Sequence, residues 1–391
     1  MSFLDNLLAN FKKGALALDD SSQSVLGIDI GASSIKVVQI RKDKGKALLE
    51  TYGQIYLAPY AKKEAGRVAN LDDELIAQAL LDLIKEANIT SLDAGVSIPF
   101  TSAFSKVIKV PKVSNSQLAK VIPIEARKYV PMPLNEVSLN WVVIPEQNTY
   151  NFLFNKEQEE SVDENRQKID FTEVLLVAVH KDSISKTQSV IQKAGINASF
   201  YELGAFSAIR SILDFDILPN MLVDIAATNT KIYVVESGIL RFSYLINFGS
   251  QHVTENISRA LSVPFEKAER IKKEQGWIAL DNQTLVNTGS DIQKTNLAIE
   301  SVLNRVFSEM NRVIINYEKR YGRTIKKIHF FGGGSNMPGF LDFANKKLSI
   351  DAVLADSFNK IVAPAFLEPV LKDIGTDFAI SNGLALRKIS G

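Results

Sequence analysis

Residues 27–38, GIDIGASSIKVV, carry the pattern that decides the fold. Apolar runs at 24–30 and 35–41 flank the small residues 31–34, which predicts a β-hairpin rather than a strand, turn and helix. Asp29 stands at the end of the first run, Gly31 permits close backbone approach, and Ser33 and Ser34 add hydroxyl groups to the turn. Such a turn can hold a phosphate group, although taken alone it also fits an ordinary hairpin.

A second stretch repeats this layout. Residues 222–226 form an apolar run, residues 227–230 a small polar turn, and residues 231–235 a second apolar run. Asp224 again stands before a turn rich in hydroxyl groups, supplied by Thr228 and Thr230. Two opposed turns of this kind can clamp phosphates with Mg²⁺ between them. The repeat therefore predicts two related lobes.

The rest of the chain alternates between helical and strand periodicity. Helices are predicted at residues 72–88, 114–128, 183–194, 205–213, 253–261, 264–275 and 295–321. Strands are predicted at residues 53–57, 94–98, 137–144, 174–179, near 200, and 327–331. This order is typical of an α/β fold.

Composition excludes some classes of function. The chain has 391 residues, with 45 basic against 44 acidic side chains, so nothing in its net charge favours binding to nucleic acid. Cysteine is absent, which excludes disulfides and favours a reducing compartment. No apolar run reaches the roughly 18 residues of a membrane span. Residues 1–13 are expected to form an amphipathic helix that packs on its own domain, docks on a partner or lies on a membrane surface. The polar residues 146–170 are expected to form a solvated loop.

Two further segments could contact a nucleotide. Residues 331–339, FGGGSNMPG, follow a predicted strand, and their glycines would let a base or ribose lie against the backbone. Glu269, Lys272 and Lys273 share one face of a predicted helix. Taken alone, the first segment fits a flexible loop and the second a solvated helix face.

Taken together and in this order, the four segments resemble the ATPase domain of the actin superfamily, over residues 25–388. The resemblance implies a two-lobed, ribonuclease H-like α/β fold that binds ATP and Mg²⁺. It implies water-mediated metal contacts from Asp29 and Asp224, a catalytic role for Asp224, and a water-orienting role for Glu202 at the start of a connecting helix. The implied contacts to nucleotide come from Asp29, Gly31, Ser33, Ser34, Lys36, Ala226, Thr228, Thr230, Glu269, Lys272, Lys273, Gly332, Gly333, Gly334 and Asn336.

Three segments resemble one family within this superfamily, the PilM family of type IV pilus assembly proteins. They are residues 27–38, the proline-punctuated residues 125–137, and residues 382–387. In this family and its FtsA relatives, an extra subdomain replaces the usual actin insertion. The implied division begins with an N-terminal helix and linker at 1–24. The first lobe then spans 25–97 and 179–220, with the inserted subdomain at 98–178 between these two parts. The second lobe spans 221–362, with its helical part at about 252–324, and the chain returns to the first lobe at 363–391.

One departure concerns the second phosphate turn. Relatives have glycines there, whereas this chain has Ala226, Ala227 and Asn229. Alanine at a position of positive φ would cost about 1 kcal/mol, so we expect a shifted turn and ATP hydrolysis that is slow or absent.

The resemblance implies a cytoplasmic adaptor at the inner face of the cytoplasmic membrane. Its expected partners are the cytoplasmic tail of a PilN-like membrane protein, other pilus platform proteins and the assembly ATPases. Self-association is a further option, and membrane contact is expected only through a partner. Candidates for the peptide contact or its support are Tyr129, Met132, Leu134 and Val137, which could instead be core. One alternative is an FtsA-like filament-forming scaffold, which is disfavoured because only residues 388–391 follow the last expected helix. The other is a small-molecule kinase, for which no catalytic base is evident.

Overall fold

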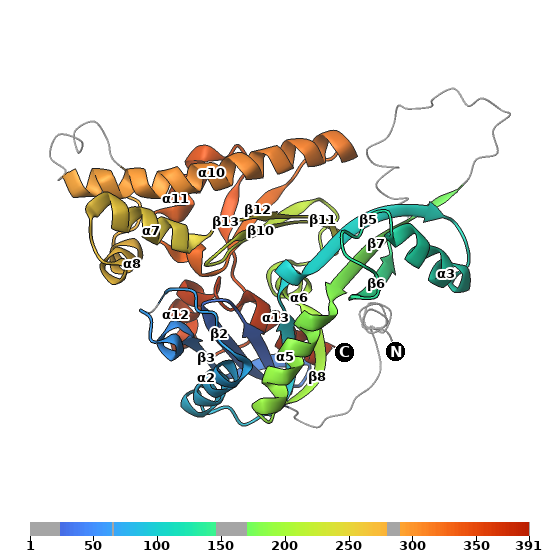
Figure 1. The fold of residues 1–391 in the computed structure, drawn as a ribbon, viewed down its shortest axis with the longest axis horizontal. Helices are drawn as coiled ribbons and strands as arrows, with labels where there is room; N and C mark the ends of the chain where they lie inside the picture. Colours follow the sequence, from blue (N-terminus) through green and yellow to red (C-terminus); the bar gives the residue numbers. More distant parts are fainter. Residues whose placement is uncertain (1–23, 65, 146–169, 280–289, 391) are drawn as a thin grey trace.

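The computed structural model describes residues 24–64, 66–145, 170–279 and 290–390. These residues form three β-sheets with helices packed around them (Figure 1). Two of the sheets have five strands in equivalent order, β3-β2-β1-β4-β8 and β11-β10-β9-β12-β13. In each, the first three strands are antiparallel and the last two join in parallel. The repeat of one hairpin layout in the sequence therefore corresponds to two lobes of equivalent topology.

The strands of the first sheet are β1 (Ser24–Ile30), β2 (Ser34–Asp43), β3 (Lys46–Tyr56), β4 (Asp93–Ile98) and β8 (Asn197–Leu203). Those of the second are β9 (Asn220–Ile225), β10 (Thr230–Glu236), β11 (Ile239–Ile246), β12 (Lys327–Phe331) and β13 (Ala352–Leu354). The third sheet is β5-β7-β6, from β5 (Ala103–Pro111), β6 (Val137–Val143) and β7 (Phe171–His180).

Both predicted hairpins are present, and they have the same register. Asp29 lies opposite Lys36 across β1 and β2, and Asp224 lies opposite Lys231 across β9 and β10. Each turn is closed by a backbone hydrogen bond of 3.0 Å, donated by the residue two positions after the aspartate. The two acid-led turns are therefore equivalent in backbone geometry as well as in sequence.

Helices cover the faces of the first sheet. Helices α2 (Asp73–Glu86) and α5 (Lys181–Lys193) pack on each other, with Leu80, Leu83 and Val190 in one apolar core beneath them. Helix α2 begins where the Asp72 side chain accepts a hydrogen bond from the Leu75 N–H, at 2.9 Å. Helix α13 (Ala379–Ser390) packs against β1 and β2.

The second lobe has a larger helical layer. It contains α7 (Ser250–Leu261), α8 (Phe265–Glu274), the long α10 (Ser290–Tyr321) and α11 (Phe340–Lys347). Apolar residues of α10, including Phe307 and Met310, share a buried core with Phe330 of β12 and Phe340 of α11. This packing holds the turn after β12 and the N-terminus of α7 at the same end of the sheet as the β9–β10 turn.

The third sheet carries α3 (Asn115–Ala126) and extends away from the first lobe (Figure 1). It also touches the second lobe. Arg241 of β11 pairs with Glu173 of β7 at 2.6 Å, and the Ser105 and Ser243 hydroxyl groups lie 2.8 Å apart. The inserted sheet is therefore connected to one lobe by the chain and to the other by polar contacts.

The chain passes between the lobes twice, after α6 (Gly204–Ile212) and after β13, before α12 (Glu368–Ile374). Helices α6 and α13 cross at the centre of the molecule (Figure 1). A Cβ atom at Gly383 of α13 would lie 1.8 Å from the Ser207 carbonyl oxygen of α6, so only glycine permits this approach.

The α/β class and the two related lobes are confirmed. Strands β5 and β11 lie where no strand was predicted, at residues 103–111 and 239–246. The expected helix at 1–13 and the polar segment from 146 to 169 lie outside the described residues. Among the described helices, none is both long and apolar enough to cross a membrane.

Candidate nucleotide-binding cleft

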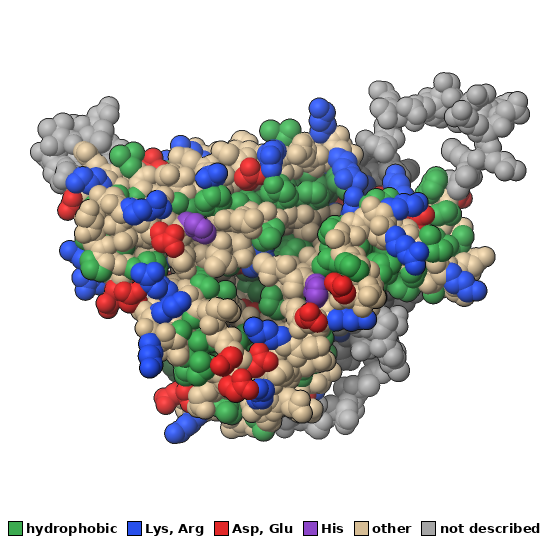
Figure 2. Space-filling model, in the orientation of Figure 1, with side chains coloured by type: hydrophobic (Ala, Val, Ile, Leu, Met, Phe, Trp, Pro, Cys, Tyr) green, Lys and Arg blue, Asp and Glu red, His purple; other side chains and the backbone are tan. Residues whose placement is uncertain are grey.

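A cavity of about 660 Å³ lies between the two five-stranded sheets. Its lining comes from both hairpin turns, the glycine-rich loop after β12 and one face of α8. The hollow between the upper and the lower lobe in Figure 2 is in the same region. Its size falls within the range of about 300 to 1,000 Å³ that is usual for small-molecule sites.

The first hairpin brings a carboxylate and an ammonium group into the cleft. The Ser97 hydroxyl of β4 donates to Asp29 Oδ1 at 2.7 Å, and Lys36 Nζ lies 3.3 Å from Asp377 Oδ1. Burial raises the pKa of Asp29, an effect that Lys36 and the Ser97 hydrogen bond oppose in part. Burial alone would lower the pKa of Lys36, but the carboxylates of Asp377, Asp29 and Asp224 outweigh it and raise that pKa.

The second hairpin presents Asp224, whose Oδ2 lies 2.7 Å from Lys231 Nζ. The carbonyl groups of Ala226 and Ala227 accept hydrogen bonds of 2.9 Å from the first backbone N–H groups of α7. The expectation of strain in this turn is wrong, because among the described non-glycine residues with positive φ none belongs to residues 226–229. Alanine fits this turn without the backbone penalty that was expected.

The glycine-rich loop lies against the second hairpin. Gly332 has φ of 83°, and a Cβ there would be 2.4 Å from Asp224 Oδ1. A Cβ at Gly334 would be 2.4 Å from the Ile225 side chain. The Asn336 amide, in the 3-10 turn that follows, donates to Asp377 Oδ2 at 2.8 Å. The glycines thus let this loop touch the turn that carries the acid.

Helix α8 brings Glu269, Lys272 and Lys273 together on one face, as their spacing in the sequence predicted. Lys272 Nζ lies 2.7 Å from Glu269 Oε2, and Lys273 Nζ lies 3.4 Å from Glu269 Oε1. Burial alone would raise the pKa of Glu269, but Lys272 outweighs it and lowers that pKa, whereas burial lowers the pKa of Lys272. Lys273 also reaches the Tyr56 hydroxyl of the first lobe, at 3.4 Å.

The structure brings most of the predicted nucleotide contacts, and the predicted metal residue Asp224, together in the lining. These are Asp29, Gly31, Ser33, Ser34, Lys36, Asp224, Ala226, Thr228, Glu269, Lys272, Lys273, Gly332, Gly333, Gly334 and Asn336. Thr230 does not line the cavity. It is fully buried, and its hydroxyl donates to the Phe248 carbonyl at 2.8 Å, so it stabilises the turn instead.

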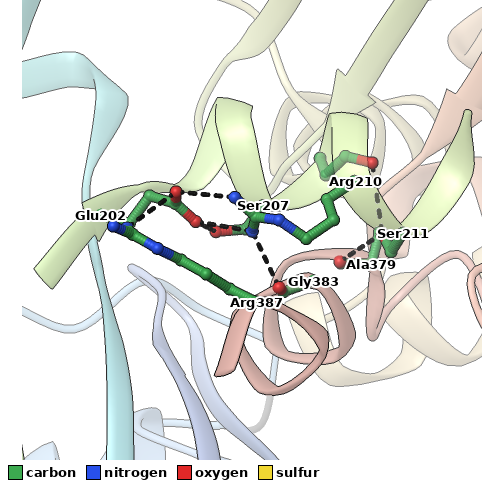
Figure 3. Close-up of polar contacts among 8 residues, drawn as sticks. Glu202, Ser207, Arg210, Ser211, Ala379, Gly383 and Arg387 are labelled. Atoms are coloured by element: carbon green, nitrogen blue, oxygen red, sulfur yellow. Dashed lines mark hydrogen bonds and ion pairs between the residues drawn. The ribbon is translucent and has the colours of Figure 1, made fainter. Parts of the chain in front are cut away.

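Glu202 also lies outside the cavity lining, in a buried cluster shown in Figure 3. It is 0% exposed, and its carboxylate accepts from Ser207, Arg210 and Arg387 at 2.7 to 3.0 Å. Burial alone would raise the pKa of Glu202, but Arg210 and Arg387 outweigh it and lower that pKa. A carboxylate with these partners cannot orient water in the cleft, so we replace the expected role with a structural one, joining α6 to α13.

The four candidate partner residues share the core of the inserted subdomain. Val137 is 3% exposed, and Tyr129, Met132 and Leu134 are partly buried against the same cluster, which includes Ile122 of α3. Val137 therefore cannot contact a partner directly. The other three each retain an exposed part.

Sequence reasoning missed several polar residues of the cleft, among them Ser97, Lys231 and Asp377. Lys231 follows Asp224 by seven positions, as Lys36 follows Asp29, so the repeat contained the signal for it. Ser97 and Asp377 reach the cleft through strand pairing and through the return of the chain to the first lobe, and no local pattern indicates either position.

The family model described as type IV pilus assembly protein PilM matches residues 27–389, which is nearly the whole chain. The chain belongs to the PilM family. A solved structure described as the PilM-PilN type IV pilus biogenesis complex has the same fold, with a TM-score of 0.74 at 19% identity over 93% of this chain and 98% of that one.

Curated relatives of this PilM family member include cell division protein FtsA. The FtsA of Neisseria meningitidis serogroup B is 22% identical over 84% of this chain and 83% of its own length. The FtsA of Buchnera aphidicola is 25% identical over 45% of this chain and 47% of its own length. The chain is thus a PilM-type protein of pilus assembly with an FtsA-like, actin-like fold.

The lining fits a nucleotide with Mg²⁺. Among the described residues, no three acidic or histidine side chains converge as ligands for a metal ion. Mg²⁺ is commonly held by one or two carboxylates together with substrate phosphates, a role for which Asp29 and Asp224 are suitably placed in the lining. The contact that a Cβ at Gly332 would make with Asp224 shows that the backbone must approach this carboxylate closely.

Proposed function

We propose that the chain is an ATP-binding adaptor of type IV pilus assembly, which binds the cytoplasmic tail of a PilN-like membrane protein. The observation that carries the nucleotide part is the cleft, in which two equivalent hairpins each present an aspartate and a lysine. The glycine-rich loop and the Glu269 face of α8 line the same cavity and are assigned to the adenosine. Family membership supports the assembly role.

The partner is proposed to bind at the inserted subdomain. Its three-stranded sheet joins the first lobe through the chain and touches the second through Glu173 and Arg241, so movement at the cleft would reach it. The half-buried Tyr129, Met132 and Leu134 supply apolar surface for a peptide that orders on binding. Through this partner the chain would sit at the inner face of the cytoplasmic membrane.

Binding measurements test the two parts separately. Calorimetry with ATP and Mg²⁺ should give saturable binding, and fluorescence anisotropy should show binding of a labelled peptide that matches the cytoplasmic tail of the cognate PilN-like protein. Absence of heat with millimolar ATP would contradict the nucleotide assignment. ATP binding without peptide binding would contradict the adaptor assignment alone.

A pair of variants locates the peptide. Met132→Ala with Leu134→Ala should weaken peptide binding by roughly tenfold or more and leave ATP affinity unchanged, because these side chains are half-buried. The buried Val137→Ala is the matched control, which should lower thermal stability but not peptide affinity. Equal peptide affinity in the double variant and the wild type would place the docking surface elsewhere.

A further inference from the structure

The two hairpins present the same pair of charged side chains to the cleft. Asp29 faces Lys36 across the first hairpin, and Asp224 faces Lys231 across the second. All four side chains line the cavity. Asp29 interacts electrostatically with Asp224 and Lys231 as well as with Lys36, so the two pairs face each other.

The pairs differ in what the lysine contacts. Lys36 Nζ turns to Asp377 at 3.3 Å, while Asp29 receives the hydroxyl of Ser97. Lys231 Nζ instead lies 2.7 Å from Asp224 Oδ2, and these side chains are 14% and 7% exposed. Asp224 therefore already has a cation in direct contact, which can neutralise its charge as a divalent ion would.

From this difference we infer that Lys231 is the built-in counter-cation of Asp224 and makes nucleotide binding in the cleft largely independent of Mg²⁺. The inference rests on the proposed nucleotide site. It assigns a specificity-determining role to a residue that the actin-like resemblance did not single out.

The charges of the lining support this role. The cavity is lined by four carboxylates, Asp29, Asp224, Glu269 and Asp377, and by five ammonium groups, Lys36, Lys186, Lys231, Lys272 and Lys273. Without Lys231, Asp224 would face a polyphosphate as a nearly buried anion with no cation in direct contact, unless a metal ion took its place. Lys231 and Mg²⁺ can thus each neutralise the Asp224 carboxylate, and either cation suffices for ATP to bind beside it.

The test compares nucleotide affinity with Mg²⁺ and with EDTA, by calorimetry with ATP. For the wild type, the two dissociation constants should agree to within about fivefold. For Lys231→Met, the measured quantity is the ratio of the two dissociation constants. ATP should bind to this variant at least about tenfold more weakly in EDTA than in Mg²⁺, because the uncompensated Asp224 repels the phosphates. Lys231→Arg keeps the cation and should behave as the wild type.

Lys36→Met is the matched control from the equivalent position of the other hairpin. Because Lys36 does not compensate Asp224 by direct contact, its loss should weaken ATP binding in both buffers alike. Equal weakening of Lys231→Met in both buffers, or no weakening in EDTA, would overturn the inference while leaving the nucleotide site intact. A wild type that binds ATP in neither buffer would overturn the nucleotide site and the inference together.

A double variant covers the case in which Lys231→Met does not fold. Asp224→Asn combined with Lys231→Met removes both charges, so no carboxylate is left to compensate. Its dissociation constants for ATP in EDTA and in Mg²⁺ should therefore agree to within about fivefold, as in the wild type. A double variant that still requires Mg²⁺ would overturn the inference.

Discussion

At the scale of single residues, Gly332 has the most demanding position in the cleft. Its φ of 83° disfavours any L side chain, and a Cβ would meet Asp224 Oδ1 at 2.4 Å. Gly332→Ala should therefore weaken ATP binding by roughly tenfold or more and lower the free energy of unfolding by about 1 to 2 kcal/mol. Calorimetry and denaturant unfolding measure the two effects.

Gly322 provides the control for Gly332. Its φ of 62° imposes the same kind of backbone strain, but a Cβ there would meet no atom within 4 Å. Gly322→Ala should lower stability slightly and leave ATP affinity unchanged. If both alanine variants bind ATP as the wild type does, the glycine-rich loop does not contact the nucleotide.

His329 in β12 gives a pH dependence to stability. Burial, aided by Lys327, lowers the pKa of His329 to about 4, whereas an unfolded chain has its usual value near 6.5. Between these values the unfolded state binds more protons, so stability falls as the pH falls from about 6.5 towards 4, by about 1 to 2 kcal/mol. Denaturant unfolding of His329→Gln should show a flatter dependence in this window, and a curve parallel to that of the wild type would contradict the assignment.

At the scale of elements, the crossing of α6 and α13 depends on Gly383. An added Cβ would lie 1.8 Å from a backbone oxygen of α6, which cannot move independently of the helix. Gly383→Ala should therefore lower the free energy of unfolding by about 3 kcal/mol or more. At Gly204, also buried in this region, a Cβ would meet the tip of the Ile380 side chain at 2.9 Å, so Gly204→Ala should be much milder by thermal melting.

The elements predicted best are those whose hydrophobic pattern matches their burial. Both hairpins and the helices α2, α5 and α8 follow their local periodicity. Strand β5 was missed because lysines and a serine interrupt its apolar residues and are accommodated by pairing with β7, which lies more than 60 residues later. Long-range pairing of this kind leaves no local pattern in the sequence.

The candidate site was predictable to the extent that it is local. The turns, the glycine-rich loop and the face of α8 were each visible as short motifs, and they meet in one cavity. Glu202 was misjudged because its position before a helix does not reveal its partners, Arg210 and Arg387, the second of which lies 185 positions away. Asp377 was missed for the same reason.

At the scale of the whole molecule, the pairing of charges limits catalysis. Asp224 and Glu269 each contact a lysine, Asp377 contacts Lys36 and Asn336, and Asp29 accepts from Ser97. Since Glu202 lies elsewhere, each of the four carboxylates in the cavity lining already has a hydrogen-bond or ion-pair partner, which disfavours its use in orienting an attacking water molecule. We expect steady-state hydrolysis below about 1 s⁻¹, beneath the usual range of dedicated kinases. A phosphate-release assay that gave a higher rate would contradict this arrangement.

The attachment of the inserted sheet at two points has a mechanical consequence. Its strands are rooted in one lobe, while Glu173 and Ser105 hold it to Arg241 and Ser243 of the other. A rotation of one lobe against the other must then either rupture these polar contacts or tilt the sheet as a lever. In the second case, a small displacement at these contacts would become a larger displacement at α3, so opening and closing of the lobes would move the far end of the inserted subdomain.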